Sequence, residues 1–597
     1  MTGTAAALPR SPQFAPHPLQ PFLRRIWPWL AAISSGVLLT LSFPPFDQGW
    51  LIWFALAPLI CAVWFSEGSR RSRWRPAWLG YVTGIVYFTG VFHWLSNLGT
   101  LFRNPILFGL PLLLSLVLGL YIAFWAWFIS WLPTRDADAF RSSRRNLAIG
   151  VLAACAWVVQ EWVRGWLFSG FGWNGLGIAL YKNLPMIQIA EIAGVLGVSW
   201  LVAYCNVMAV VVVRRIIGDL GLQFLRRIRW EFSISMAVVA AVFVYGIFVL
   251  FRPPAIEHVP LRVAMIQPNI PQDEKWSREA EDQVFEKLKA LTARATQAKS
   301  GVDEQKAKAL FDQAKSDPGK QVYINLPSIS SIHPDLVVWP ESAMPRGMFA
   351  DDYSYDFVLS QVRNSDFALL LGTILSDEPS GNDYNGAALI SDKGQRIQLY
   401  RKMHLVPFGE YLPLRPVLGP IAGGLVPGDF TAGTTPNVMT LSSPQIRFGT
   451  LICFEDTLGD LCRRFVGNGA QLLINLTNDG WFLKSAAAEQ QFHHALFRAI
   501  ENRRPLLRCA NTGITGSVDA FGRTERWAPP FTEAVVAREI AVPRNPGYTF
   551  YTRFGDWLAY ASLAFLLLWT MVRINRKSFR PGGPSLRAGE EPASSKP

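Results

Sequence analysis

Charged residues are scarce in this chain of 597 residues, since only 17% of them are Asp, Glu, Lys or Arg, against about 25% in an ordinary soluble domain. Cysteine is also rare, and six cysteines in so long a chain exclude a small domain held together by disulfides. The histidines show no metal-ligand spacing, and no glycine-rich phosphate-binding loop occurs. We therefore expect no metal and no other cofactor.

Apolar and aromatic residues are abundant instead. Half of the chain is hydrophobic, and its 39 Phe and 23 Trp exclude a disordered polypeptide. The mean hydropathy of +0.20 is high for a soluble protein but modest for one embedded wholly in a membrane. The sequence therefore indicates a mixture of membrane and soluble parts.

The long apolar runs lie at the two ends of the chain. A helix needs about 20 apolar residues to cross a bilayer, and we predict seven such spans before residue 252 and an eighth near the C-terminus. The predicted spans are 27–43, 50–66, 77–95, 105–132, 146–163, 186–213, 233–251 and 556–572. The predicted domains are a disordered tail at 1–24, a seven-helix membrane domain at 25–252, a soluble domain at 261–546, a closing helix at 556–574 and a tail at 575–597.

Basic residues predict the orientation of these helices. They gather at 70–75, 135–145 and 214–229, which follow the second, fourth and sixth spans, whereas the loops after odd-numbered spans contain few. By the positive-inside rule, both termini are then cytoplasmic and the soluble domain lies on the outer side. The net charge of +13 (57 basic minus 44 acidic residues) mostly reflects this topology. We therefore expect no nucleic-acid partner.

Polar residues inside the membrane region need a reason, because burying them in lipid is costly. Glu161 and Arg164 are spaced i, i+3, so they could pair on one helix face. The loop after them, 165–177, is rich in glycine and aromatic residues and includes Trp173. Two interpretations stay open for this loop. It is either an interfacial aromatic belt or an entrance for a lipid chain, with Trp173, Glu161 and Arg164 as the candidate residues.

The soluble domain alternates strand-like apolar stretches with helical ones, which predicts a layered α/β fold. The predicted strands are 261–267, 336–341, 367–375, 384–391, 446–453 and 470–477, and a helix is predicted at 485–503. Functional groups in such folds gather where strands end.

Three strand ends or nearby loops carry reactive residues. Glu341 follows Trp339-Pro340, where the proline marks the exit of the strand. Lys402 lies in YRKMHLVPFGEYLP, and Cys453 follows an apolar strand and precedes a predicted helix start, which would lower the pKa of the thiol. Each alone has a structural explanation, as a solvated carboxylate, a surface lysine or a buried cysteine. Together they supply a base, an oxyanion partner and a nucleophile for acyl transfer.

The motifs around these residues resemble a known family. WPES, YRKMHLVPFGEYLP and ICFED resemble the Glu-Lys-Cys signature of the nitrilase (carbon–nitrogen hydrolase) superfamily. NIPQDEKW (269–276), LTNDGWF (476–482) and CANTGIT (509–515), together with the order of the spans, resemble the apolipoprotein N-acyltransferase family over about 25–575. The resemblance implies a membrane α-helical bundle of about eight helices with an extracytoplasmic α-β-β-α sandwich.

The resemblance also implies roles for individual residues. Glu341 corresponds to the general base, Lys402 to the lysine that stabilises the oxyanion, and Cys453 to the nucleophile. Supporting roles fall on Glu410, Glu455, Trp276 and Asn385.

The implied activity is transfer of an acyl chain from a phospholipid, with phosphatidylethanolamine as the expected donor, through a Cys453 thioester. The acceptor is the α-amino group of an S-diacylglyceryl cysteine at the N-terminus of an apolipoprotein. The implied location is the bacterial inner membrane, with the catalytic domain on the periplasmic side. A monomer is the simplest expectation for the oligomeric state.

The sequence departs from the family pattern at a few places. Phe454 stands where the family usually has tyrosine, Gly480 replaces a common alanine, and a charged segment at 297–330 is extra. Two other functions stay open: a membrane-anchored nitrilase-type amidase that hydrolyses a C–N bond, and a non-catalytic scaffold with a decayed nitrilase domain. A disulfide between Cys462 and Cys509 also stays open.

Overall fold

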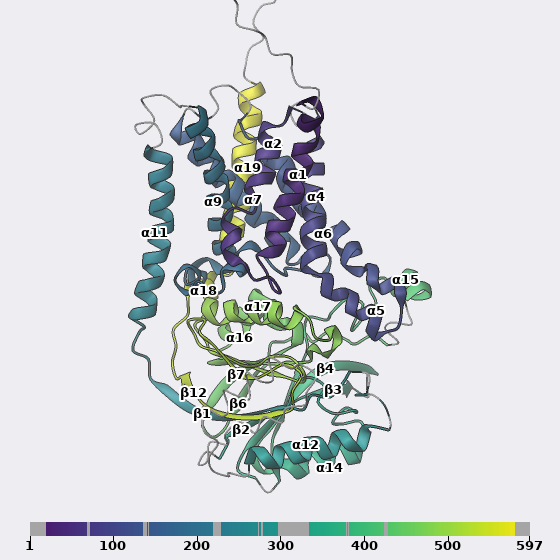
Figure 1. The fold of residues 1–597 in the computed structure, drawn as a ribbon. Coiled ribbons are helices and arrows are strands. Elements are labelled where there is room, and N and C mark those ends of the chain that lie inside the picture. Colours follow the sequence, from purple (N-terminus) through teal and green to yellow (C-terminus); the bar gives the residue numbers. More distant parts are fainter. Residues whose placement is uncertain are drawn as a thin grey trace, which may run out of the picture.

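The computed structural model describes residues 20–67, 72–134, 140, 142–218, 229–272, 274–275, 277, 279–296, 333–363, 365–377, 379, 381–422 and 428–578. A bundle of helices stands on a two-sheet sandwich, and the first and last described helices, Gln20–Leu41 and Trp557–Ser578, both belong to the bundle (Figure 1). Trp276 and the extra segment 297–330 lie outside the described residues.

The bundle is built from the N-terminal helices and the last helix of the chain. Its main helices are α1 (Gln20–Leu41), α2 (Ala57–Phe65), α4 (Arg75–Val91), α6 (Leu110–Ile129), α7 (Ser143–Arg164), α9 (Ala190–Gly218), α11 (Arg229–Phe251) and α19 (Trp557–Ser578). Shorter helices α5 (Asn97–Leu101) and α18 (Phe550–Phe554) lie between the bundle and the sandwich, and α8 (Leu184–Ile187) packs against α11 and α9.

Five helices in the described part of the chain are long and apolar enough to cross a membrane. They are Pro105–Ile129, Ser143–Arg164, Ala190–Ile217, Trp230–Phe251 and Trp557–Asn575. The predicted span 50–66 is instead a short 3₁₀ turn, Gly49–Trp53, followed by α2. In the central helices α7 and α9, 67% of the residues in the apolar stretch are buried, whereas in α11 only 6% are. An apolar helix with so few fully buried residues needs a lipid environment.

The sandwich consists of two six-stranded sheets, with strand orders β12-β1-β2-β3-β4-β5 and β11-β10-β9-β8-β7-β6. The strands of the first sheet are β1 (His258–Gln267), β2 (Leu336–Val338), β3 (Ala368–Asp377), β4 (Asn382–Ile390), β5 (Ile397–Arg401) and β12 (Ala534–Pro543). Those of the second are β6 (Val438–Leu441), β7 (Ile446–Ile452), β8 (Leu472–Thr477), β9 (Leu506–Ala510), β10 (Thr515–Val518) and β11 (Thr524–Ala528). All six predicted strands are confirmed.

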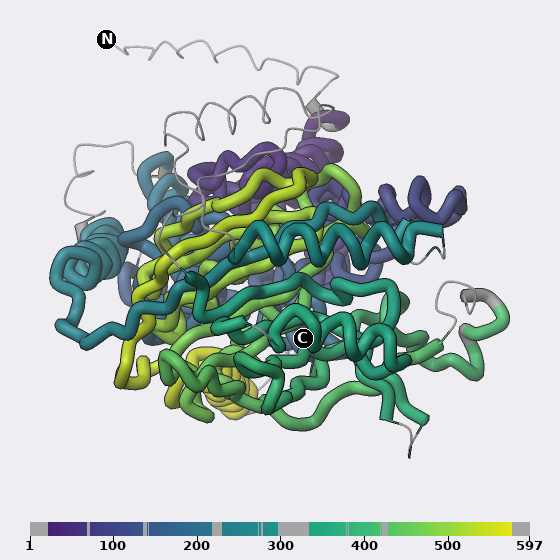
Figure 2. Tube along the Cα trace, turned by 90° about the horizontal axis from the view of Figure 1, so that it is seen from below, coloured from purple at the N-terminus to yellow at the C-terminus, as the bar shows by residue number. Residues whose placement is uncertain are grey.

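Helices cover the outer faces of both sheets. Seen from below, α12 (Glu281–Thr296) lies in front of the strands, and α14 (Asp352–Val362) covers the same side (Figures 1 and 2). On the other side, α16 (Gly459–Gly467) and α17 (Ala487–Asn502) separate the second sheet from the bundle. The four layers confirm the predicted α-β-β-α fold. Every residue of α17 except Glu489 is buried, because the helix has the sheet below it and the bundle above it.

Parallel pairing places reactive residues at one edge of the sandwich. β2 runs parallel to β1 and β3, and β7 runs parallel to β8. A Cβ on Gly372 of β3 would lie 2.6 Å from the Cα of Glu341, so only glycine lets the turn after β2 approach this closely.

Cys462 and Cys509 are both free, buried thiols, so the disulfide between them does not form.

Candidate active site

Glu341, Lys402 and Cys453 each follow the end of a strand, and the structure brings them to one place. Glu341 lies in the turn after β2, Lys402 follows β5 directly, and Cys453 follows β7 directly. The Nζ of Lys402 lies 3.8 Å from the Oε1 of Glu341. The charges of both residues act on the Cys453 thiol. The clustering that the sequence predicted is therefore present.

Asn385 and Glu410 join this cluster through Lys402. The Nζ of Lys402 lies 2.9 Å from the Oε1 of Glu410. The Nδ2 of Asn385 donates to the Oε1 of Glu341 at 2.9 Å and to the Oε1 of Glu410 at 2.6 Å. The backbone N–H of Val406 donates to the other oxygen of Glu410. One ammonium and one amide thus hold two carboxylates together.

Burial and the neighbouring charges set the protonation of Lys402 and Glu341. Burial disfavours charge on Lys402, but Glu410 and Glu341 outweigh it, so the pKa of the lysine is raised and it stays an ammonium. Burial also raises the pKa of Glu341, and Lys402 offsets part of that rise. The Oε2 of Glu341 is buried and has no hydrogen-bond partner among the described residues. Glu341 therefore has one oxygen anchored and one free to take a proton.

Cys453 has an unusual backbone conformation. Its φ is +52°, a backbone conformation that residues other than glycine rarely adopt. Its carbonyl oxygen accepts hydrogen bonds from the Nε2 of Gln491 at 2.8 Å and from the Nδ2 of Asn475 at 3.2 Å. Such strain persists only where surrounding contacts enforce it, and these two amides supply part of that enforcement.

The predicted lowering of the Cys453 pKa is wrong. Burial, and then the charge of Glu341, raise the pKa of this thiol well above its usual value, and Lys402 offsets only part of the rise. The following helix is one 3₁₀ turn, Cys453–Thr457, which is too short for a substantial dipole. The thiol is therefore neutral at rest and needs a base to become a nucleophile.

Glu455 is a buried carboxylate whose hydrogen bonds all go to the protein around the site. Its carboxylate accepts hydrogen bonds from the Tyr400 hydroxyl at 2.9 Å and from three backbone N–H groups. These belong to Ile452 at 2.9 Å, Met403 at 2.8 Å and His404 at 3.1 Å. Glu455 thus joins the strand end before Cys453 to the segment that follows Lys402.

Glu455→Gln is expected to destabilise the protein by about 1–3 kcal/mol, because the amide presents an N–H to backbone donors and leaves them unsatisfied. Acyl transfer is expected to fall with it, since Lys402 and Cys453 lose their common anchor. Thermal unfolding and activity measure the two effects. The matched control is Glu286→Gln, whose exposed ion pair with Lys289 contributes little. Equal stability of the two variants would contradict the anchoring role.

A buried ionic network next to Cys453 has residues that the sequence analysis missed. Arg508 donates two hydrogen bonds to Asp479, at 3.0 and 3.1 Å, and its Nε lies 3.5 Å from Asp456. Burial raises the pKa of Asp456 to about 7, while Arg508 acts to lower it. The motifs ICFED and LTNDGWF contain the two aspartates, but nothing in the sequence marks Arg508.

Lys275 was also missed, although it precedes Trp276 in the NIPQDEKW motif. Its Nζ donates to the backbone carbonyl of Glu341 at 3.2 Å. Burial lowers the pKa of Lys275 to about 8, against the opposing charge of Glu341. A second lysine therefore fixes the turn that carries Glu341.

Aromatic side chains from the bundle cover the residue next to Cys453. The ring of Trp173 stacks on Phe454 at 5.8 Å and 14°, and Phe171 stacks on Phe454 at 6.1 Å and 2°. Trp173 is only 4% exposed, so it does not belong to a lipid-facing belt. In the same loop, Phe168 is 86% exposed and Trp166 is 52% exposed. The loop thus has one part against the site and one part facing outward.

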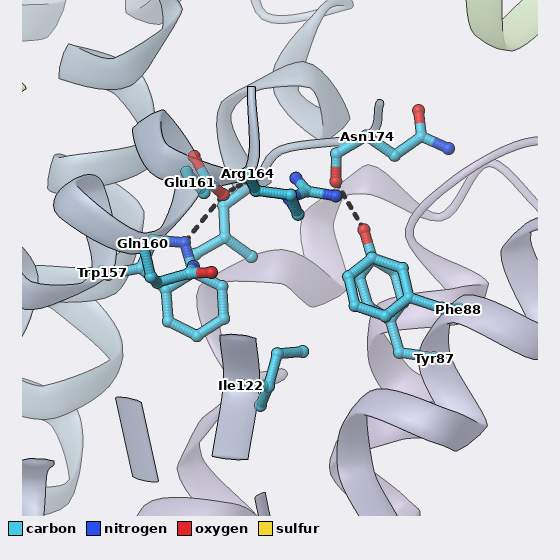
Figure 3. A pocket seen from close by; sticks show the side chains of 9 residues that line it. Tyr87, Phe88, Ile122, Trp157, Gln160, Glu161, Arg164 and Asn174 are labelled. Atoms are coloured by element: carbon cyan, nitrogen blue, oxygen red, sulfur yellow. Dashed lines mark hydrogen bonds between the residues drawn. The ribbon is translucent and has the colours of Figure 1, made fainter. Parts of the chain in front are cut away.

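Glu161 and Arg164 do not pair with each other, so the ion pair that their spacing allows is not formed. The Oε1 of Glu161 accepts from the Nε1 of Trp157 and the backbone N–H of Leu176, whereas the Nη1 of Arg164 donates to the Trp173 carbonyl. Figure 3 shows the two side chains directed apart around a small cavity. The returning loop offers backbone partners to both residues, and these replace the i, i+3 contact. The cavity of ≈ 10 Å³ has room for about one water and not for an acyl chain.

The chemical capacity of this arrangement follows from its groups. A buried carboxylate with a free oxygen, a permanent ammonium and a neutral thiol can form and resolve a thioester. Among the described residues, no group of three or more His, Cys, Asp or Glu side chains could hold a metal ion.

Comparison with known proteins gives the same assignment over both parts of the chain. Residues 35–208 match the apolipoprotein N-acyltransferase N-terminal domain, and residues 262–541 match the carbon-nitrogen hydrolase family. An apolipoprotein N-acyltransferase of Geobacter metallireducens is 32% identical over 564 residues, which cover 92% of this chain and 96% of the relative. The corresponding protein of Methylococcus capsulatus is 30% identical over 94% of this chain and 99% of the relative. The chain belongs to the apolipoprotein N-acyltransferase family.

Proposed function

We propose that this enzyme transfers a fatty acyl chain from a phospholipid, with phosphatidylethanolamine as the expected donor, to the N-terminal S-diacylglyceryl cysteine of apolipoproteins. The observation that carries the proposal is the cluster of Glu341 and Lys402 beside Cys453, walled by Trp173 of the bundle. A hydrolase acting on soluble amides has no need for such a wall, whereas an enzyme with two lipid substrates does.

In the first half-reaction, Glu341 removes the proton of the Cys453 thiol, and the thiolate attacks the ester carbonyl of the phospholipid. Lys402 stabilises the oxyanion of the tetrahedral intermediate. The intermediate collapses with cleavage of the ester C–O bond, and the leaving alkoxide takes the proton from Glu341. The products are a lysophospholipid and a thioester on Cys453.

In the second half-reaction, the neutral α-amine of the acceptor attacks the thioester carbonyl. Glu341 takes a proton from the attacking nitrogen, the C–S bond breaks, and this proton returns to the Cys453 sulfur. An amide forms and the enzyme is regenerated, which is a ping-pong scheme. The thioester must persist until the amine arrives, so water has to be excluded, and the stack of Trp173 and Phe171 on Phe454 suits that task.

The supporting residues fit this scheme at different distances from the reaction. Glu410 and Asn385 fix the positions of the Lys402 and Glu341 side chains by hydrogen bonds. Trp276 remains a predicted supporting residue. For the lipid entrance, we propose that Trp173 lines it, while Glu161 and Arg164 act indirectly by holding the ends of its loop.

The proposed setting is the bacterial inner membrane, with eight spans, the domain limits predicted above, both termini in the cytoplasm and the catalytic domain in the periplasm. Two features support it. Arginine-rich segments follow alternate predicted spans, and the sandwich packs on one end of the bundle (Figure 1). We propose that a monomer suffices, since Glu341, Lys402 and Cys453 all come from one chain.

A reconstitution experiment tests the function. The purified protein is incubated with phosphatidylethanolamine and a diacylated lipopeptide that has a free N-terminal cysteine amine. We expect acylated peptide and lysophospholipid in equal amounts. Release of free fatty acid without acylated peptide would reject the transferase and favour the amidase-type hydrolase.

A further inference from the structure

Two consecutive glutamines of α17 connect the bundle to the nucleophile. Gln490 and Gln491 are both buried, at 0% and 3% exposure. Because α17 lies between the second sheet and the bundle (Figure 1), consecutive residues on it, which point about 100° apart, can reach different neighbours. Gln490 contacts the bundle, and Gln491 contacts the residues around Cys453.

Gln490 uses the full hydrogen-bonding capacity of its amide on the bundle. Its Oε1 accepts from the Nε1 of Trp94 at 3.1 Å, the Nε1 of Trp173 at 3.0 Å and the Nδ2 of Asn174 at 3.0 Å. Its Nε2 donates to the carbonyls of Pro44 at 2.9 Å and Val91 at 3.1 Å. Three donors on one side and two carbonyls on the other fix the orientation of the amide, and neither glutamate nor leucine can satisfy both sets.

Gln491 makes hydrogen bonds to the segment that carries Cys453. Its Nε2 donates to the Cys453 carbonyl at 2.8 Å and to the Oδ1 of Asp456 at 3.0 Å. The two glutamines share one peptide bond inside a helix that is buried on all sides, so their Cα atoms cannot shift independently. The bundle loop and the backbone of Cys453 are therefore both held by one rigid helix, through separate side chains.

A contact between Trp173 and Phe454 also connects the bundle to the segment that carries Cys453. Trp173 receives its position from Gln490 through the indole N–H, and its ring lies on Phe454, the residue next to Cys453. One turn further along α17, the Nε2 of His494 accepts from the backbone N–H of Asn174 at 3.0 Å. Burial lowers the pKa of His494, which keeps the ring neutral and able to accept. The aromatic wall is thus fixed by α17 on one side and by Phe454 on the other.

We propose that Gln490 is a positioning residue for acyl transfer: it fixes Trp173 against Phe454, so that the aromatic wall from the bundle and the Cys453 nucleophile form one rigid acyl-binding unit. The proposal rests on the proposed role of Cys453 as the acylated residue. Gln490 touches no reacting atom in this scheme, and its effect passes through Trp173. Displacement of this aromatic wall should slow the reaction of Cys453 with a lipid acyl chain, which packs against the wall. It should not slow the reaction with a small thiol reagent.

The test compares two reactions of Cys453 in Gln490→Leu. Acylation by phosphatidylethanolamine vesicles is expected to slow by about tenfold or more, because a displaced wall misplaces the ester by a fraction of an ångström or more. Alkylation by iodoacetamide, which needs no acyl pocket, is expected to keep the wild-type rate. Intact-mass measurement with peptide mapping follows both modifications at Cys453. Equal slowing of the two reactions would overturn the proposal, since it would indicate general damage to the nucleophile.

A double-mutant cycle with Trp173→Leu shows whether Gln490 acts through the indole. If it does, the double variant acylates no more slowly than the slower single variant. If the two rate losses multiply, Gln490 acts independently of Trp173 and the positioning role is overturned. A merely structural role would lower the thermal midpoint without producing this coupling.

Gln188→Leu is the matched control. Gln188 is also a fully buried glutamine at the junction. Its Nε2 donates to the carbonyls of Phe521 and Leu184 at 2.9 Å and its Oε1 accepts from Arg503 at 2.7 Å, so its hydrogen bonds do not involve Trp173. We expect a comparable fall in thermal midpoint and an acylation rate close to that of the wild type. A loss of acylation as large as that of Gln490→Leu would overturn the proposal. If the wild type forms no adduct while iodoacetamide still reacts, the proposed function fails as well, so the two failures are distinguishable.

Discussion

Cys453→Ala is expected to abolish acyl transfer and to leave the protein without an acyl adduct after incubation with phospholipid. Removal of a nucleophile that acts as a unit with its base costs at least about 10⁴-fold in rate. The loss should be of this size here because the described part of the chain offers no substitute. Cys462 and Cys509 are fully buried thiols that donate to backbone carbonyls, and Cys61, Cys155 and Cys205 lie in the bundle.

The measurement is the intact mass of the wild type and the variant after exposure to phosphatidylethanolamine without acceptor. The wild type should gain the mass of one acyl chain minus the displaced proton, and Cys453→Ala should gain nothing. Cys462→Ala is the control, because it also removes one buried sulfur but should keep the adduct. A wild type that also gains no acyl mass would instead support the non-catalytic scaffold.

The high pKa of the Cys453 thiol gives this experiment a pH dependence. Thiolate is not present in advance, so the rate of adduct formation follows the fraction of Glu341 that is ionised and able to take the proton. Since burial raises the pKa of Glu341, adduct formation should fall as the pH drops through that raised value. A rate that stays constant at low pH would contradict Glu341 as the base.

The sequence predicts strands and strand ends well, because these depend on local composition. The apolar stretches at β1, β2, β3, β4, β7 and β8 are long enough to be recognised and too short to be helices of the bundle. Glu341, Lys402 and Cys453 follow directly from them, since each stands at or just beyond such an end. The predicted α-β-β-α layers then require that these ends meet.

The structure differs from the local sequence pattern where tertiary surroundings decide. The spacing of Glu161 and Arg164 permits a helical ion pair, but the loop returning past α7 supplies an N–H and a carbonyl that satisfy each of them. For Cys453, the local pattern indicated a helix dipole, whereas burial by distant segments determines the pKa. Gln490 illustrates the same limit, because four of its five partners lie over 300 residues away in sequence and the fifth lies over 400 away.

Lys402→Met is expected to lower the rate of adduct formation by about 10²–10³-fold, the cost of removing one oxyanion-stabilising group. The neutral side chain has similar length and fills the same buried volume, so the change is mainly electrostatic. Glu341 and Glu410, which share Asn385, then lose the ammonium between them. The repulsion that Glu410 exerts on Glu341 is then no longer balanced, so Glu341 retains its proton more often.

This loss moves the pH profile in a definite direction. Lys402 lowers the pKa of Glu341 against the effect of burial, so its removal raises that pKa further. The base is then ionised only at higher pH, and the rising limb of the rate–pH profile should shift to higher pH in Lys402→Met. The control is Lys287→Met, because Lys287 forms a surface ion pair with Glu533 and its charge does not reach the site. A lower rate with an unshifted profile would mean that Lys402 stabilises the oxyanion without tuning Glu341, and a shift without loss of maximal rate would mean the reverse.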